Sequence, residues 1–262
     1  MIFGKPYNKK YIPARLLVLI PIVFYISSCQ KTFTPETKKG NVKITFVNTI
    51  KGAPIVFNTT NYTNPFAEPY TVSKFLYYIS NVELPYATGS FKETESYHLV
   101  DESKPASLSF SFSAPLNTYS SFSFMLGVDS LKNVSGAQSG ALDPTNGMFW
   151  TWSTGYIMAK FEGNSPVSTQ VNNKVEYHIG GFAGTDKVLK NLSLTFPVGK
   201  QLNIREGKTS EILIMTDFDK WWQTPNDIKI TTTPVCTTPG ALAKKIADNY
   251  SKMFTITDVL NN

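Results

Sequence analysis

The sequence predicts an all-β protein: an antiparallel β-sandwich with long loops and a short C-terminal helix. Apolar and polar residues alternate with period two in several short segments, as in strands that bury one face. Clusters of Gly, Pro and Asn separate these segments, which is typical of a β-sandwich. Only one segment, close to the C-terminus, reads as a good helix.

The first 28 residues have the layout of an export signal. An apolar run over residues 16–26 is about half as long as the roughly 20 residues of a transmembrane helix, so cleavage explains it better than spanning. Ile26-Ser27-Ser28-Cys29 resembles the lipobox of bacterial lipoproteins, whose cysteine sulfur receives diacylglycerol before cleavage. We therefore predict a signal peptide over residues 1–28, lipidation of Cys29, and anchoring to the bacterial outer membrane, facing the periplasm or the medium.

The mature chain divides into a tether and one domain. Residues 29–41 are polar and lack periodicity, as expected of a flexible tether. Residues 42–262 are predicted to form a single domain, whose first strand is the alternating segment 42–47. The other predicted strands cover residues 72–84, 107–112, 121–127, 156–161, 175–179, 192–196 and 211–215, and the predicted helix covers residues 240–250.

Charge and cysteine content narrow the function. Cleavage after residue 28 removes four basic residues and no acidic one, so the formal net charge falls from +6 to +2. The mature chain then lacks the basic surplus of a nucleic-acid-binding protein, and this class is excluded. Acylation of Cys29 leaves Cys236 without an intrachain partner, so a hydrophobic core must stabilise the domain.

No catalytic signature is present. The chain contains two histidines, His98 and His178, and neither a Gly-x-Ser-x-Gly elbow, a His-Glu-x-x-His helix, a Cys-x-x-Cys pair nor a phosphate-binding loop. We predict no enzymatic activity. The alternative is a Ser/His/Asp set assembled only in the fold, which would place a histidine beside a carboxylate and a hydroxyl.

Several segments, taken in order, resemble the MbnP-like family, which is named for a methanobactin-associated periplasmic protein. The resemblance extends over roughly residues 42–215. Its segments are Lys74-Phe75-Leu76-Tyr77-Tyr78-Ile79-Ser80-Asn81-Val82, Gly127-Val128-Asp129-Ser130, Gly140-Ala141-Leu142-Asp143-Pro144, Gly147-Met148-Phe149-Trp150-Thr151-Trp152-Ser153-Thr154-Gly155-Tyr156, Phe161-Glu162-Gly163 and Tyr177-His178-Ile179-Gly180-Gly181.

The resemblance implies a copper-binding protein in which a separate di-haem enzyme of the MauG type oxidises a tryptophan to kynurenine. In related proteins the modified tryptophan lies two residues before a histidine, and a second histidine follows downstream. Trp150 matches the modified residue and His178 the downstream ligand. Trp152 stands where the family pattern has histidine, so His98 and the thioether of Met148 are candidates for the missing ligand. His98 fits a surface position on a strand equally well, and Met148 also fits core packing.

Other interpretations stay open. Trp150 and Trp152 could be packing aromatics without a redox role. Asp129 and Asp143 belong to an oxygen-rich loop that fits either a calcium site or turns without a metal. The alternative function is a surface lipoprotein that binds glycan or protein through exposed aromatics such as Trp221 and Trp222, without a metal. Trp221 and Trp222 also fit a buried pair at the end of a strand, and the sequence favours that interpretation.

Overall fold

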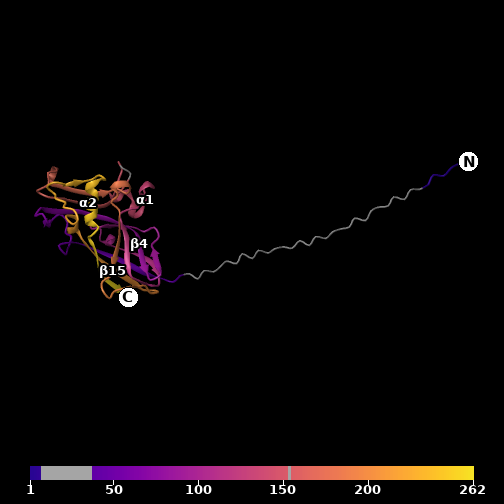
Figure 1. Ribbon diagram of the computed structural model, residues 1–262, viewed down its shortest axis with the longest axis horizontal. Coiled ribbons are helices and arrows are strands. Elements are labelled where there is room, and N and C mark those ends of the chain that lie inside the picture. Colours follow the sequence, from indigo (N-terminus) through magenta and orange to yellow (C-terminus); the bar gives the residue numbers. More distant parts are fainter. Residues whose placement is uncertain (7–36, 153–154) are drawn as a thin grey trace. The chain divides into compact units, whose positions relative to one another are not determined.

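A smaller and a larger β-sheet pack against each other, in agreement with the predicted sandwich (Figure 1). The computed structural model describes residues 1–6, 37–152 and 155–262. Thr37–Asn262 form one unit by their contacts. The predicted lipidation site, Cys29, and most of the signal peptide and tether lie outside the described residues. Within the described residues, no helix is long and apolar enough to cross a membrane.

The strands and helices have the following bounds. The smaller sheet comprises β1 (Lys39–Ile50), β2 (Ala53–Pro54), β7 (Ser109–Pro115), β15 (Thr209–Asp217) and β17 (Phe254–Asn261). The larger sheet comprises β3 (Tyr62–Thr63), β4 (Pro69–Tyr86), β5 (Gly89–Lys92), β6 (Tyr97–Asp101), β9 (Ser121–Leu126), β10 (Phe149–Trp150), β11 (Gly155–Asn164), β12 (Lys174–Gly180), β13 (Lys190–Thr195) and β16 (Val235–Cys236). A separate short pair comprises β8 (Thr118–Tyr119) and β14 (Leu202–Asn203). The α-helices are α1 (Ser130–Val134) and α2 (Ala241–Tyr250), and the 3₁₀ helices are η1 (Pro105–Leu108), η2 (Gly140–Leu142), η3 (Pro144–Asn146), η4 (Val171–Asn173), η5 (Gly184–Asp186) and η6 (Phe218–Trp221).

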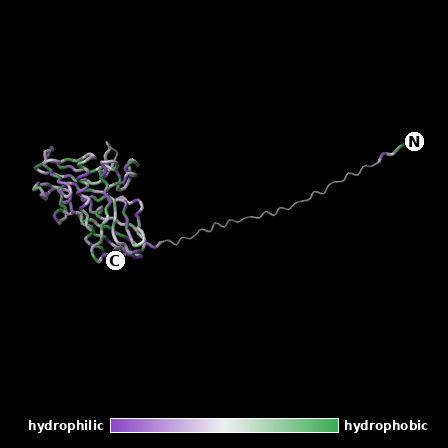
Figure 2. Tube along the Cα trace, in the orientation of Figure 1, coloured by the Kyte–Doolittle hydropathy of each residue, from purple (hydrophilic) through white to green (hydrophobic). Residues whose placement is uncertain are grey.

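Each predicted strand overlaps an observed one, although residues 107–108 belong to η1, and alternating burial is clearest in β15. In β15 every second residue is buried from Ser210 to Thr216, because successive side chains of a strand point to opposite faces. Hydrophobic and hydrophilic residues accordingly alternate along much of the domain trace (Figure 2). The first strand begins at Lys39, three residues before the predicted boundary at Val42.

Two pairings, β1 with β15 and the short pair β12 with β16, depart from the predicted antiparallel arrangement. β1 and β15 run parallel, from Asn41 opposite Thr209 to Thr49 opposite Asp217. β15 also pairs with β17, and this pair is antiparallel. The sandwich is therefore mixed at the centre of its smaller sheet.

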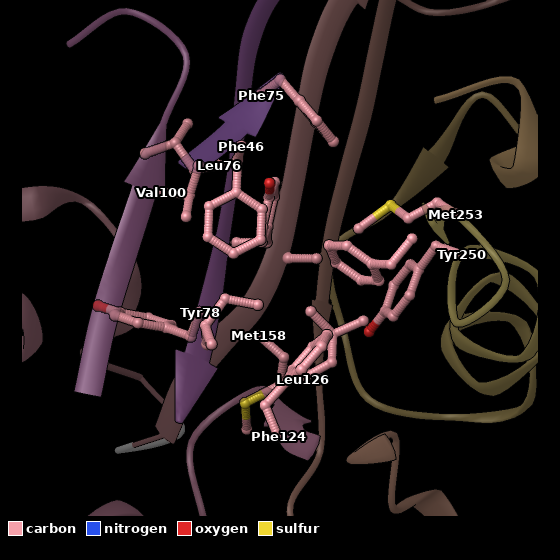
Figure 3. Close-up of a cluster of buried hydrophobic side chains, with 14 of the residues drawn as sticks. Phe46, Phe75, Leu76, Tyr78, Val100, Phe124, Leu126, Met158, Tyr250 and Met253 are labelled. Atoms are coloured by element: carbon pink, nitrogen blue, oxygen red, sulfur yellow. The ribbon is translucent and has the colours of Figure 1, made fainter. Parts of the chain in front are cut away.

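Aromatic side chains join the two sheets. Phe46 of β1 lies 5.9 Å from Tyr77 of β4, measured between ring centroids, and Phe254 of β17 lies 5.5 Å from Tyr77. Phe124 of β9 lies 5.2 Å from Phe254, so the contacts run along the interface (Figure 3). Rings in edge-to-face contact at these distances add to the stabilisation that comes from burying their area.

The predicted C-terminal helix is confirmed as α2. Its buried side chains follow helical spacing and form one stripe against the core: Ala243, Ile246, Ala247 and Tyr250. Gly240 precedes the helix at φ 148°, a conformation that favours glycine.

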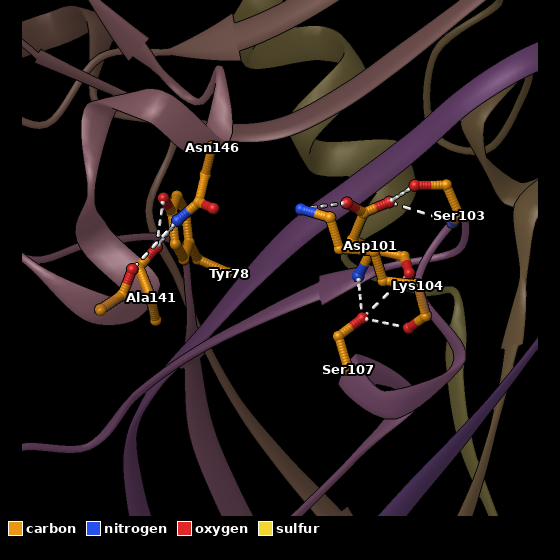
Figure 4. A network of polar contacts seen from close by, with 8 residues as sticks. Tyr78, Asp101, Ser103, Lys104, Ser107, Ala141 and Asn146 are labelled. Carbon is orange, nitrogen blue, oxygen red and sulfur yellow. Dashed lines mark hydrogen bonds and ion pairs between the residues drawn. The ribbon is translucent and has the colours of Figure 1, made fainter.

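The long loop after β9 is fixed to the outer face of the larger sheet. Tyr77 points into the sandwich, so its neighbour Tyr78 points outward, where its hydroxyl donates to the carbonyl of Ala141 at 3.0 Å (Figure 4). The Tyr156 hydroxyl donates to the carbonyl of Leu142 at 2.7 Å. In Figure 1, α1 of this loop lies toward one end of the domain and the start of β1 toward the other.

Candidate functional site

The indole of Trp150 lies against the backbone of β12. Trp150 pairs with Gly155 across the β10–β11 ribbon, and its side chain is 6% exposed. A Cβ atom added to Gly180 would lie 2.3 Å from Cζ3 of Trp150 and 2.6 Å from Cη2. The indole thus occupies the space in which a side chain at position 180 would lie.

His178 lies on the same face of β12 as this contact. Residues two apart in a strand share a face, so the His178 side chain projects on the side of the sheet where Trp150 covers Gly180. Trp150 and His178, the two residues that the family resemblance assigns to the copper site, therefore lie on the same face of the larger sheet, and their roles stay predictions.

Glu162 holds His178 in place, and two lysines lie beside Glu162. Its Nε2 lies 2.9 Å from Oε1 of Glu162 on the neighbouring strand β11, and Oε2 of Glu162 lies 2.9 Å from Nζ of Lys74 on β4. Lys160, whose Cα is the register partner of His178, has its Nζ 4.0 Å from Glu162 and donates a hydrogen bond to the carbonyl of Gly147. Lys160 thereby links this cluster to the loop that carries Trp150.

The protonation of Glu162 follows from these partners. The hydrogen bond with His178 and the nearby Lys74 outweigh the cost of burial and lower the pKa of Glu162 to about 2. Burial lowers the pKa of Lys160. At neutral pH the carboxylate is charged and can orient the imidazole.

The charged Glu162 should make stability depend on pH. Its pKa is lower in the folded protein than the ordinary value of 4.5, so its contribution is complete above about pH 4.5 and is lost as the pH falls toward about 2. We expect Glu162→Gln to lower the free energy of unfolding at pH 7 by about 1–3 kcal/mol. The free energy of unfolding of this variant should also decrease less than that of the wild type as the pH drops below about 5. Urea denaturation across this pH range measures both effects. Glu176→Gln, at the register-paired position of β12 with a carboxylate 30% exposed, is the matched control and should change neither. Equal pH profiles for wild type and Glu162→Gln would contradict the prediction.

His98 does not share the site with His178. His98 is the register partner of Ile79, whereas His178 aligns through Lys160 with Leu76. Positions 76 and 79 are an odd number of residues apart on β4, so the two histidines lie on opposite faces of the sheet. The prediction that His98 supplies the second nitrogen at a site built on His178 is therefore wrong, because the strand register separates the two side chains.

The surroundings of His98 also differ from a catalytic triad. Its ring stacks on Phe110 at 3.6 Å between centroids, and its Nε2 lies 2.9 Å from Oε2 of Glu93. Ser96 donates its hydroxyl hydrogen bond to the same carboxylate oxygen at 2.6 Å. In a catalytic triad the hydroxyl would bond the imidazole, and the carboxylate would lie on the far side of the ring.

The soft sulfur atoms are buried. Met148 is fully buried, and its carbonyl accepts a hydrogen bond from the amide of Ile157 at 2.9 Å. Packing accounts for this side chain, and its role as a copper ligand stays a prediction. Cys236 is buried as well, and burial raises the pKa of its thiol to about 11, so the free thiol is protonated at neutral pH.

The two aspartates proposed for calcium have structural partners. Asp129 caps α1 by accepting from the amide of Lys132 at 3.1 Å, and it also accepts from the hydroxyl of Tyr97. Asp143 caps η3 by accepting from the amide of Thr145 at 2.8 Å. No group of three or more His, Cys, Asp or Glu side chains suited to a metal ion occurs in the part of the chain that the structure describes. The loop therefore fits the interpretation as capped turns.

A shallow hollow of about 220 Å³ adjoins Trp150. Its walls include Tyr156, Phe182, Asp186 and Pro239. Trp152, two residues after Trp150, is 62% exposed, and its ring centroid lies 5.3 Å from that of Trp150. By contrast, Trp221 and Trp222 are fully buried, so the prediction that they form an exposed binding platform is wrong.

The sequence did not single out Glu162, Lys74, Lys160 or Gly180 as parts of the site. All but Lys160 lie within the segments that carry the family resemblance, and this was the only available signal. Their roles depend on strand register, which places Lys74, Glu162 and His178 together.

The fold and this face define the class of protein: a two-sheet β domain in which a tryptophan covers the backbone of β12 two residues from a histidine on the same outer face of the larger sheet. A family model described as MbnP matches residues 39–238, and the chain belongs to this family. A solved structure of MbnP from Methylosinus trichosporium is similar with a TM-score of 0.51 and 13% identity, over 86% of this chain and 99% of that chain. This likeness concerns the fold. A comparison with curated proteins found no match.

Proposed function

We propose that this protein is a lipid-anchored member of the MbnP family in the bacterial cell envelope, in which Trp150 is oxidised to kynurenine and, together with His178, binds copper. The observation that supports the proposal is the packing of the Trp150 indole on Gly180, two residues from His178. A di-haem peroxidase of the MauG type is the proposed oxidising partner, and the protein performs no turnover of its own.

The donor set fits copper in a specific way. Nε2 of His178 is hydrogen-bonded with Glu162, so Nδ1 is the ring nitrogen that is left to bind a metal. A carboxylate on the other ring nitrogen is the usual support for a metal-binding histidine, because it fixes the tautomer and raises the basicity of the ligand. Imidazole is a suitable ligand for copper.

Oxidation of Trp150 would complete the site. Indole donates a hydrogen bond but is no metal ligand, whereas kynurenine has an aromatic amine and a ketone oxygen. The balanced conversion takes two hydrogen peroxide molecules per tryptophan, gives N-formylkynurenine and two water molecules, and then consumes one water to release formic acid. Copper binding is therefore conditional on the modification. Because Trp152 replaces the adjacent histidine, the site has one imidazole and the kynurenine donors.

Mass measurement and copper titration test the proposal together. Intact mass of the native protein should show acyl chains on Cys29, and peptide mapping should show kynurenine at position 150. We expect His178→Ala to weaken the binding of Cu(I) to the modified protein by at least about tenfold, since it removes a ligand. Competition with a chromophoric chelator measures the affinity.

His98→Ala is the matched control and should bind copper as the wild type does, because His98 lies on the opposite face of the sheet. Glu162→Gln should weaken binding less than His178→Ala, since it removes support for the ligand and not the ligand itself. An unmodified Trp150 in native protein, with equal weak titrations for wild type and His178→Ala, would refute the proposal.

A further inference from the structure

Trp150 and Trp152 form an aromatic pair in which Trp150 is buried and Trp152 is exposed. Their ring centroids lie 5.3 Å apart with 39° between the ring planes. Trp150 is 6% exposed and Trp152 is 62% exposed. Of the four tryptophans in the chain, all of them in described segments, Trp152 alone is exposed.

The residue proposed to be oxidised, Trp150, is therefore buried, and Trp152 is the ring of the pair that reaches the surface. A buried indole cannot be reached by an oxidising group that is itself held inside a large partner. Electron transfer falls steeply with distance, so a redox-active ring in contact with Trp150 shortens the path to the outside. Tyr156, the other redox-active side chain that lines the hollow beside Trp150, is buried and its hydroxyl donates to a backbone carbonyl, so the exposed Trp152 indole is better suited to this step.

The surface around Trp152 suits a protein partner. Leu131 and Val134 of α1 are 73% and 69% exposed. α1 lies beside the β10–β11 ribbon, since Asn133 accepts from the amide of Tyr156 at 2.8 Å and Ser130 donates to the carbonyl of Phe182 at 3.1 Å. Exposed apolar side chains near an exposed aromatic are typical of protein interfaces.

We infer that Trp152 is the relay through which Trp150 loses electrons to a one-electron oxidant carried by a partner protein. The inference rests on the proposed function, in which Trp150 is oxidised, and it adds the path by which the electrons leave Trp150. In each step one electron passes from the Trp150 indole through the Trp152 ring to the oxidant, which is reduced by one electron. The Trp150 radical cation then releases its indole N–H proton to solvent. Trp152 regains its electron from Trp150 and ends unchanged.

The test uses the full chain, produced without an oxidising partner, and a bulky soluble oxidant. A ruthenium tris(bipyridine) complex is photo-oxidised with pentaamminechlorocobalt(III) as the electron acceptor, and peptide mass spectrometry follows the loss of Trp150. We expect Trp152→Phe to slow this loss by about tenfold or more, since phenylalanine does not relay an electron. Trp152→Tyr should retain most of the rate, because phenol is redox active.

Leu131→Ala is the matched control on the same face. It should leave the rate unchanged, and if it slows the reaction as much as Trp152→Phe, the effect comes from docking of the oxidant and the relay is refuted. The relay is also refuted if the Trp152→Phe variant loses Trp150 at the wild-type rate, or if the wild type does not lose Trp150 at all. These outcomes are independent of copper titration and of native kynurenine, so failure of the relay and failure of the proposed function can be told apart.

Discussion

Trp222→Ala should destabilise the domain by about 3–5 kcal/mol, the usual cost of deleting a buried indole. Trp222 is fully buried, with its ring centroid 4.9 Å from that of Tyr70 and 5.9 Å from that of Phe161. Its Nε1 donates to the Tyr70 hydroxyl at 3.3 Å, so the substitution also leaves a buried hydroxyl without this partner. Urea denaturation measures the loss in the free energy of unfolding.

Trp152→Ala is the matched control for this large effect. The side chain is 62% exposed, and its removal should cost less than about 1 kcal/mol. A small loss for Trp222→Ala combined with abolished glycan binding would contradict the buried position and restore the interpretation of Trp222 as a surface platform. The comparison therefore decides between a core role and a binding role for the Trp221-Trp222 pair.

The strands could be predicted because their evidence is local. Alternation over residues 42–47 and 211–215 reports which face of each strand is buried, whatever the partner strand is. The same signal was overlooked in β17, where Phe254, Ile256 and Val259 are buried, with a register shift opposite Leu213 and Ile214 breaking the strict period of two. The parallel pairing of β1 with β15 joins segments more than 150 residues apart, and no local pattern specifies it.

The site could be predicted in part for a similar reason. Trp150 and His178 were singled out from the order of the family-like segments, and the fold places Trp150 on the backbone of β12 two residues from His178. The error over His98 came from register: a histidine in a strand can point to either face, and only its alignment with Ile79 decides which. For Trp221 and Trp222 the sequence left both a buried pair and an exposed platform open, because an aromatic pair at the end of a strand has the same sequence pattern in either position.

Gly180→Ala should displace the Trp150 indole and disrupt the proposed site. The added Cβ would lie 2.3 Å from Cζ3 of a ring fixed between β10 and β12, so the ring or the strand must move. We expect a cost of about 1–3 kcal/mol in the free energy of unfolding, and a large shift of the Trp150 indole N–H resonance in NMR spectra. In the modified protein, copper affinity should fall because the kynurenine donors move relative to His178.

Gly155→Ala provides the matched control, since Gly155 is the register partner of Trp150 and yet has room for a methyl group. Its added Cβ would meet Oδ1 of Asn133 at 3.6 Å and Cε1 of Phe182 at 3.7 Å, which are ordinary contact distances. Stability, the Trp150 resonance and copper affinity should therefore stay near wild type. If Gly180→Ala leaves the Trp150 resonance as unchanged as Gly155→Ala does, the indole is not held against β12, and the proximity of Trp150 to His178 loses its structural basis.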